Sequence, residues 1–170
     1  MKRISILGAT GSVGTSTLDL VARNPARFEV AVLTACHNWR RLAELALAHR
    51  AKRAVIADGS HYQDLKQALQ GSGIEVAAGA DALVEAALAP ADLVVAAIVG
   101  AAGLRPTLAA LQAGTSVALA NKEALVCAGS LMTGAARQSG AKILPIDSEH
   151  NAIFQVLEES ARVRRVWLTA

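Results

Sequence analysis

The chain has 170 residues, a formal net charge of +3, and a composition that is 53% hydrophobic but only 3% aromatic. This length suits one domain, or one domain and part of a second. The small net charge and the scarcity of aromatic side chains argue against a nucleic-acid-binding protein, and the apolar stretches are too short to cross a membrane.

Short apolar runs alternate with segments of helical periodicity along the chain. Strands are expected at 4–7, 30–35, 53–57, 74–77, 93–99, 117–120, 142–146 and 164–169. Helices are expected at 16–21, 39–49, 62–70, 80–88, 104–113, 124–139 and 151–158. Repeated β–α units predict an α/β fold, with a doubly wound, mostly parallel, Rossmann-like sheet and helices on both faces. Ligands of such sheets bind beyond the carboxyl ends of the strands, so functional residues should directly follow strands.

The first strand is followed by a turn with glycines at three-residue spacing, Gly8, Gly11 and Gly14. Glycine permits positive φ and close approach to the backbone, and a helix start offers free N–H groups with partial positive charge. The motif therefore predicts a pyrophosphate seat in which Gly8 forms the turn, Gly11 admits the ligand and Gly14 packs helix on strand. An ordinary glycine-rich turn is the alternative, because the spacing differs from the commoner G-x-G-x-x-G.

The end of the second strand bears on the choice between NAD and NADP. A NAD site usually has an Asp or Glu here, whereas this chain has T-A-C-H-N at 34–38, followed by Arg40 and Arg41. The missing acid and the two arginines favour a 2′-phosphate and therefore NADP. Alternatively, the arginines lie on the solvated face of the next helix and Asn38 caps that helix.

Three polar residues, Asn121, Lys122 and Glu123, directly follow another predicted strand. A lysine at this place suits a phosphate or a carbonyl oxygen, and the asparagine amide suits a nicotinamide or a ribose. A helix N-cap at Asn121, with charged first-turn residues in water, explains the same residues equally well.

An acidic pair, Asp147 and Glu149, stands at the end of the strand expected at 142–146. An extended backbone would direct both carboxylates to one side, where they repel unless a proton or a cation lies between them. Oxygen ligands would select Mg²⁺ or Mn²⁺ over zinc. The alternative is that Asp147 or Ser148 caps the following helix. We interpret His150 as a polar loop residue, because no second histidine is near.

The two cysteines, Cys36 and Cys127, lie far apart in the sequence and form no metal-binding pattern. They suit a reducing cytosol, and the chain begins with an apolar strand instead of a signal peptide. We therefore predict a cytoplasmic location.

Four segments together resemble one family. They are ILGATGSVGTSTLDLV, AAIVGAAGLRPTLAAL, LANKEALV and LPIDSEHNAIFQ, and they occur in the family's order. The chain is similar to the 1-deoxy-D-xylulose 5-phosphate reductoisomerases of the non-mevalonate isoprenoid pathway. The first segment alone also fits aspartate-semialdehyde dehydrogenases, which share a GATG turn.

The resemblance implies an enzyme that binds NADPH and Mg²⁺ or Mn²⁺. Such an enzyme rearranges its sugar-phosphate substrate and then reduces the resulting aldehyde to 2-C-methyl-D-erythritol 4-phosphate. The cofactor contacts that the resemblance implies are Thr10, Gly11, Ser12, Val13, Cys36, His37, Asn38, Asn121 and Glu123. It implies that Lys122 and Ser148 contact the substrate, and that Asp147 and Glu149 bind the metal, Glu149 thereby also being catalytic. The full-length protein is expected to be a homodimer.

This chain departs from the family pattern in two respects. Members often have Gly followed by Lys or Arg where this chain has Cys36-His37, so the 2′-phosphate would have a weaker, pH-dependent partner. Members also continue well beyond residue 170, through a third metal carboxylate and a helical domain. We therefore expect 1–150 to form an NADPH-binding domain, 151–170 to begin a catalytic domain, and this chain to be inactive alone.

Two other functions fit parts of the sequence. One is a non-catalytic NADP-binding sensor module, and the other is a different NADP reductase, such as a semialdehyde dehydrogenase. The second needs a nucleophilic cysteine, and Cys127 is a poor candidate because it lies inside a predicted helix without an adjacent base.

Overall fold

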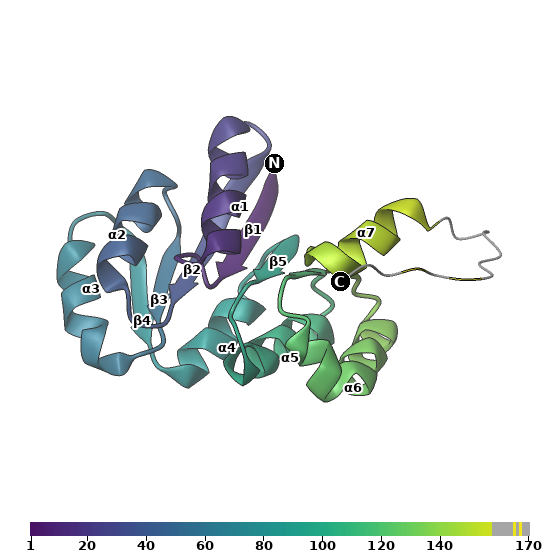
Figure 1. Ribbon diagram of the computed structural model, residues 1–170. Helices are drawn as coiled ribbons and strands as arrows, with labels where there is room; N and C mark the ends of the chain where they lie inside the picture. Colours follow the sequence, from purple (N-terminus) through teal and green to yellow (C-terminus); the bar gives the residue numbers. More distant parts are fainter. Residues whose placement is uncertain (158–164, 166, 168–170) are drawn as a thin grey trace.

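The computed structural model describes residues 1–157, 165 and 167. Seven strands form one sheet in the order β4-β3-β2-β1-β5-β6-β7, and every neighbouring pair is parallel. Figure 1 labels β1 to β5 and the helices around the sheet. The strands are β1 (Lys2–Leu7), β2 (Phe28–Ala35), β3 (Arg53–Ile56), β4 (Glu75–Ala78), β5 (Leu93–Ala96), β6 (Val117–Leu119) and β7 (Ile143–Pro145). The predicted α/β, doubly wound, Rossmann-like fold is therefore confirmed.

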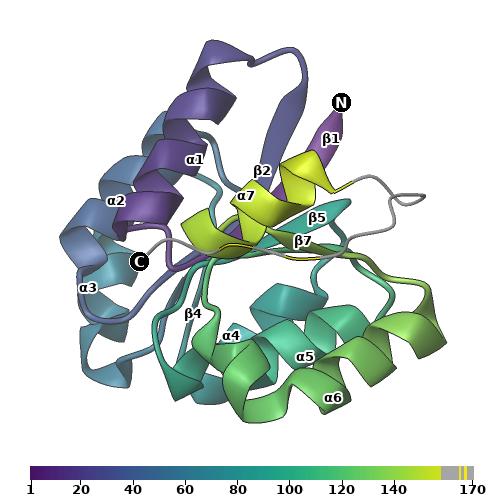
Figure 2. The same cartoon turned by 45° about the vertical axis from the view of Figure 1, so that its right-hand side comes forward.

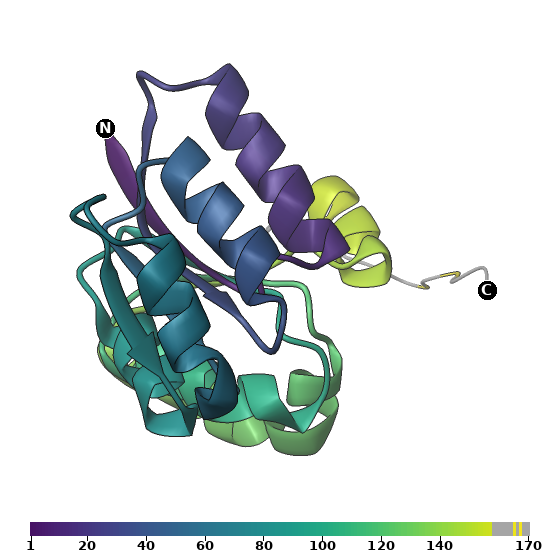
Figure 3. The same cartoon turned by 90° about the vertical axis from the view of Figure 1, so that its left-hand side faces the viewer.

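Helices cover both faces of this sheet (Figures 2 and 3). One face carries α1 (Ser12–Arg23), α2 (Trp39–Ala48), η1 (Gly59–His61) and α3 (Tyr62–Ala68). The other carries α4 (Ala80–Leu88), η2 (Ala101–Gly103), α5 (Leu104–Gln112) and α6 (Glu123–Ser139). The last helix, α7 (Ser148–Val156), follows β7 and lies on the same side of the sheet as α1 (Figure 2). Of the helices in the described ranges, none combines the length and apolarity that a membrane span requires.

Two hydrophobic cores lie on either side of the sheet. Leu18 of α1 and Leu42 of α2 belong to the first core, and Leu111 of α5 and Met132 of α6 belong to the second, all of them fully buried. The short strands are apolar on both faces because each face is covered by helices. Leucine and alanine dominate the helical contribution, which explains how a chain with so few aromatic residues closes its core.

The strand order reverses between β2-β1 and β5-β6, so β1 and β5 flank the topological switch point. In a parallel sheet the segments that follow the strands all lie at one edge, and the switch point opens a crevice there. This edge holds the turn after β1 and the loops after β2, β5, β6 and β7.

Several element boundaries differ from the sequence predictions. Helix α1 begins at Ser12 instead of 16, and α7 begins at Ser148 instead of 151. The central strand β5 ends at Ala96, short of the predicted 99. Helix α6 kinks at Ala128, whose φ and ψ of −143° and 31° are not helical. The strand predicted at 164–169 and the last residue of the helix predicted at 151–158 fall outside the described residues, apart from 165 and 167.

Candidate cofactor and metal site

The turn between β1 and α1 is built on two glycines that no other residue replaces easily. Gly8 has a φ of +88°, and a Cβ there would lie 2.6 Å from the carbonyl oxygen of Ala97, just past β5. A Cβ on Gly14 would collide with the carbonyl oxygen of Gly8. Gly8 thus makes the turn and lets it pass close to the neighbouring strand, while Gly14 lets α1 pack on the turn, as the sequence predicts.

The start of α1 is open. A Cβ on Gly11 would meet nothing nearer than the Gly8 carbonyl oxygen at 3.5 Å. Gly11 and Ser12 are exposed, and Thr10 and Val13 are partly buried. Gly11 carries no side chain to cap the helix, and its first turn has no acidic residue. The first N–H groups of a helix have no intrahelical partners, so this end favours an anion.

The residues after β2 are exposed at the same edge. Cys36, His37 and Asn38 are all accessible, and the Asn38 side chain accepts a hydrogen bond of 3.1 Å from the N–H of Arg41. Asn38 therefore caps α2, as the alternative interpretation predicted. The Arg41 guanidinium lies 2.8 Å from Glu44, whereas the Arg40 guanidinium stacks 4.6 Å above the ring of Trp39.

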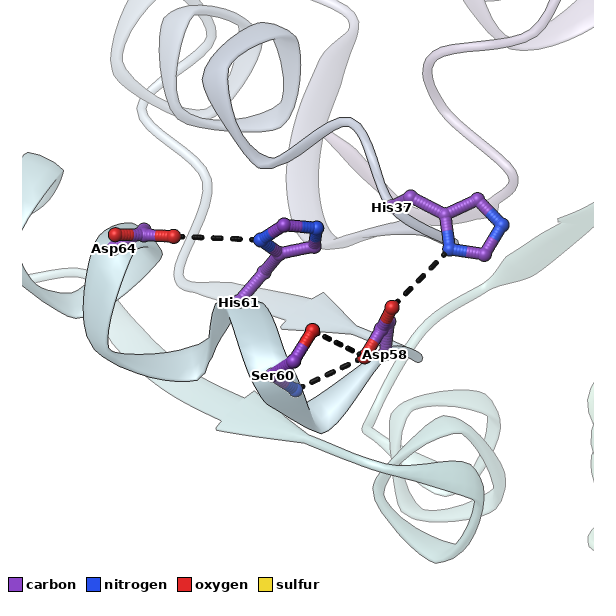
Figure 4. A network of polar contacts seen from close by, with 5 residues as sticks. All are labelled: His37, Asp58, Ser60, His61 and Asp64. Carbon is purple, nitrogen blue, oxygen red and sulfur yellow. Dashed lines mark hydrogen bonds and ion pairs between the residues drawn. The ribbon is translucent and has the colours of Figure 1, made fainter.

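A carboxylate that the sequence analysis missed, Asp58, follows β3 beside His37 (Figure 4). Its Oδ1 accepts hydrogen bonds from the N–H of Ser60 at 2.9 Å and from the hydroxyl of Ser60 at 2.7 Å. Its Oδ2 lies 3.5 Å from Nδ1 of His37. The hydrogen bonds from Ser60 hold the pKa of Asp58 below its usual range, with a smaller contribution from His37. The rule that functional residues follow strands would have found Asp58, had it been applied to the third strand.

Asn121 is buried, with 6% of its surface exposed. Its Nδ2 donates hydrogen bonds to the carbonyl oxygens of Ile98 at 2.7 Å and of Gly100 at 2.9 Å. It thus fastens the loop after β5 to the end of β6, and its two amide hydrogens are engaged. Within the part of the chain that the structure describes, Oδ1 has no partner. Lys122 and not Asn121 occupies the N-cap position of α6, so the predicted capping role of Asn121 is wrong.

Lys122 and Glu149 form an ion pair that joins the segments after β6 and β7. Nζ of Lys122 lies 3.0 Å from Oε2 of Glu149, and both side chains are partly exposed. The hydrogen bond from Lys122 is the main cause that lowers the pKa of Glu149 to about 2, and Ser148 lowers it further. The same contact raises the pKa of Lys122. Glu123, the first residue of α6, is exposed next to this pair.

The acidic pair does not lie on an extended strand, so that prediction is wrong. Asp147 is the N-cap of α7, and its carboxylate accepts hydrogen bonds from His150, at 3.1 Å from the backbone N–H and 2.7 Å from Nδ1. Glu149 and His150 belong to the first turn of α7, which also corrects the loop predicted for His150. The capping interpretation is confirmed, because Asp147 satisfies an N–H group that the helix start would otherwise leave free.

The donor set fits a hard divalent cation in type, because both acidic side chains offer only oxygen. Only 10% of the Asp147 side chain is exposed, and it already binds His150, while Glu149 binds Lys122. Among residues 1–157, 165 and 167, no group of three or more His, Cys, Asp or Glu side chains is placed so that it could hold a metal ion. A cation at this place would therefore have to displace basic side chains, and it would need further oxygen ligands besides these two carboxylates.

The parallel sheet, the glycine turn at the switch point and the polar residues after β2, β6 and β7 define an α/β protein of the Rossmann-like class. The sequence narrows this class to one family. The model of the 1-deoxy-D-xylulose 5-phosphate reductoisomerase family matches residues 4–129, and that of its C-terminal domain matches residues 143–170. The chain belongs to the 1-deoxy-D-xylulose 5-phosphate reductoisomerase family.

Relatives agree with this assignment. The reductoisomerase of Zymomonas mobilis subsp. mobilis is 58% identical over 171 residues, which cover 99% of this chain and 44% of that protein. That of Ruegeria sp. is 53% identical, and the match covers 100% of this chain and 44% of that protein. This chain therefore spans less than half the length of these relatives.

Two solved structures superpose closely on this chain. The Zymomonas mobilis reductoisomerase in complex with NADPH gives a TM-score of 0.91 at 59% identity and covers 93% of this chain and 42% of that chain. A DOX-P reductoisomerase in complex with NADPH, fosmidomycin and magnesium gives a TM-score of 0.90 at 42% identity, covering 94% of this chain and 40% of that chain.

Proposed function

We propose that this chain supplies the NADPH-binding region, and part of the metal and substrate site, of a 1-deoxy-D-xylulose 5-phosphate reductoisomerase. The observation that carries the proposal is the position of the two parts of the site. The open start of α1 and the Lys122–Glu149 pair both follow strands of one parallel sheet, so they share its carboxyl edge. A cofactor seated on the first part can thus deliver a hydride to a substrate held at the second.

The proposed cofactor contacts follow the edge of the sheet from β1 outward. The backbone of Thr10, Gly11, Ser12 and Val13 holds the pyrophosphate, because the helix start supplies free N–H groups and positive potential. Cys36, His37 and Asn38 lie beside the adenosine ribose, as residues at the end of the second strand do in this fold. Asn121, in the loop after β6, and Glu123, at the start of α6, contact the nicotinamide end.

The proposed substrate and metal contacts lie after β6 and β7. The Lys122 ammonium and the Ser148 hydroxyl hold anionic oxygens of 1-deoxy-D-xylulose 5-phosphate, and Asp147 and Glu149 are the metal ligands. When bound, Mg²⁺ or Mn²⁺ supplies Lewis acidity toward substrate oxygens and NADPH supplies the hydride. Asn121 keeps the loop after β5 in place, which fixes one wall of the crevice where hydride transfer occurs. The product is 2-C-methyl-D-erythritol 4-phosphate.

Two relatives support these ligands, since one solved structure contains NADPH and another contains NADPH, fosmidomycin and magnesium. Residues 1–150 then form the NADPH-binding region, and 151–170 begin a catalytic domain. The full-length protein is a cytoplasmic homodimer. The two free cysteines, both exposed, suit a reducing compartment. Sedimentation equilibrium measures the oligomeric state directly.

A single methyl group at the proposed pyrophosphate seat tests the function. Gly11 has a φ of −80° and free space around its Cβ position, so Gly11→Ala should fold normally. The added methyl would occupy the space where the pyrophosphate approaches and should weaken NADPH binding about tenfold, as measured by isothermal titration calorimetry. Gly134→Ala in α6, where a Cβ would meet nothing within 4 Å, is the control. Equal NADPH affinity of both variants and the parent would reject the proposed seat.

A further inference from the structure

His37 and Asp58 are held side by side by the backbone. Strands β2 and β3 pair in register up to Ala35 and Ile56. The pairing continues past the sheet, because the N–H of Ala57 donates to Ala35 at 2.9 Å and the N–H of Asp58 donates to Cys36 at 3.0 Å. The two loops therefore leave the sheet together.

The backbone of His37 is also fixed on its other side. Its carbonyl oxygen accepts a hydrogen bond of 2.8 Å from the N–H of Trp39, and the next residue, Asn38, caps α2. Only the side-chain torsions of His37 remain free. The imidazole is 72% exposed and faces the carboxyl edge, where a cofactor ribose would lie.

The carboxylate of Asp58 favours a proton on one of the two ring nitrogens of His37. The two hydrogen bonds from Ser60 fix the carboxylate, and its second oxygen faces Nδ1 of His37 at 3.5 Å. An ionised carboxylate only accepts hydrogen bonds, so it favours the tautomer with the hydrogen on Nδ1. Nε2 is then a hydrogen-bond acceptor when the ring is neutral and a donor when the ring is charged.

We propose that His37, positioned by Asp58, is a proton-dependent selector between NADPH and NADH. The charged ring donates from Nε2 to the 2′-phosphate of NADPH, whereas the neutral ring accepts a hydrogen bond from the 2′-hydroxyl of NADH. His37 thus contacts the cofactor, and Asp58 is a positioning residue that acts through it. This inference rests on the proposed function, because it needs a nicotinamide cofactor at this edge.

Other charged groups near His37 also affect how strongly a phosphate binds here. Arg40 and Arg41 on α2 keep their charge at all relevant pH values and provide a constant attraction for a phosphate. A second histidine, His61 of η1, pairs with Asp64 at 3.3 Å on the far side of Asp58 (Figure 4). His61 is therefore the control for a second histidine near the site.

The experiment compares the dissociation constants of NADPH and NADH for the whole chain at pH 6.5 and pH 8.5 by isothermal titration calorimetry. The preference for NADPH is the dissociation constant of NADH divided by that of NADPH. From pH 6.5 to pH 8.5 this ratio should fall by about tenfold more in the parent than in His37→Lys, whose charge persists at both pH values. Because the 2′-phosphate of NADPH also gains a proton near pH 6, the variant provides the necessary reference.

Three further variants complete the test. In His37→Gln the preference for NADPH should be as weak at both pH values as it is in the parent at pH 8.5. Asp58→Asn should lose most of the preference at pH 6.5. His61→Gln should behave like the parent. The inference is overturned if the preference of the parent changes with pH no more than that of His37→Lys or His37→Gln. It is also overturned if the pH dependence disappears in His61→Gln. Failure of both cofactors to bind at either pH would instead contradict the proposed function.

Discussion

The buried amide of Asn121 should be a main source of stability at the carboxyl edge of the sheet. Asn121→Ala removes both hydrogen bonds to the loop after β5 and leaves the carbonyl oxygens of Ile98 and Gly100 without their donor. At about 1 kcal/mol for each hydrogen bond, the free energy of unfolding should fall by about 2 kcal/mol. For a chain of this size that corresponds to a decrease in Tm of about 4–8 °C.

Urea denaturation followed by circular dichroism measures this loss. The matched control is Asn24→Ala, because the Asn24 side chain donates one hydrogen bond of 2.9 Å to the carbonyl oxygen of Leu20 in exposed surroundings. We expect the control to lose less than about 0.5 kcal/mol. If Asn121→Ala were no less stable than Asn24→Ala, the loop after β5 would not depend on the asparagine, and the role assigned to Asn121 would be wrong.

Three other predictions concern the turn, the acidic pair and the cofactor preference. Gly8→Ala should lose about 1–3 kcal/mol more in urea denaturation than Gly140→Ala, since both have positive φ but only Gly8 faces a close carbonyl; equal losses would contradict this. The pKa of Glu149 is lowered from 4.5 to about 2, mainly by Lys122, so the pair stabilises the metal-free protein fully above pH 4.5 and loses this effect toward pH 2. Glu149→Gln should therefore flatten the acid limb of the stability profile, and an unchanged profile would show that the ion pair contributes nothing. Arg40→Glu should weaken NADPH binding about tenfold and NADH binding less, whereas equal losses would remove Arg40 from the 2′-phosphate site.

The sheet was predictable because most of its strands contain short apolar runs. Val30 and Leu33 on β2 belong to one core and Val32 to the other, which is the composition that a strand covered on both faces requires. The turn glycines were equally readable, since their backbone geometry and close contacts exclude larger side chains at Gly8 and Gly14.

The acidic pair was misread for a local reason. The strand before it ends at Pro145, and Asp147 caps a helix that begins at Ser148. An aspartate after a strand is expected for a ligand site and for an N-cap alike, and only the hydrogen bonds to His150 distinguish the two.

The other features that the sequence did not predict are contacts between residues far apart in the chain. Neither the ion pair between Lys122 and Glu149 nor the contact between His37 and Asp58 follows from sequence spacing, because each joins residues more than twenty positions apart. Both depend on strand order, which places the ends of β6 and β7, and of β2 and β3, next to each other. The sequence alone predicts which residues reach the carboxyl edge but not which of them meet.

A crystal structure of the protein with NADPH tests the cofactor seat most directly. We expect the pyrophosphate within hydrogen-bonding distance of the N–H groups of Ser12 and Val13, and the 2′-phosphate beside His37. A cofactor bound instead in the hollow of about 420 Å³ at the amino ends of the strands, lined by Arg3 and Arg53, would contradict the proposed site.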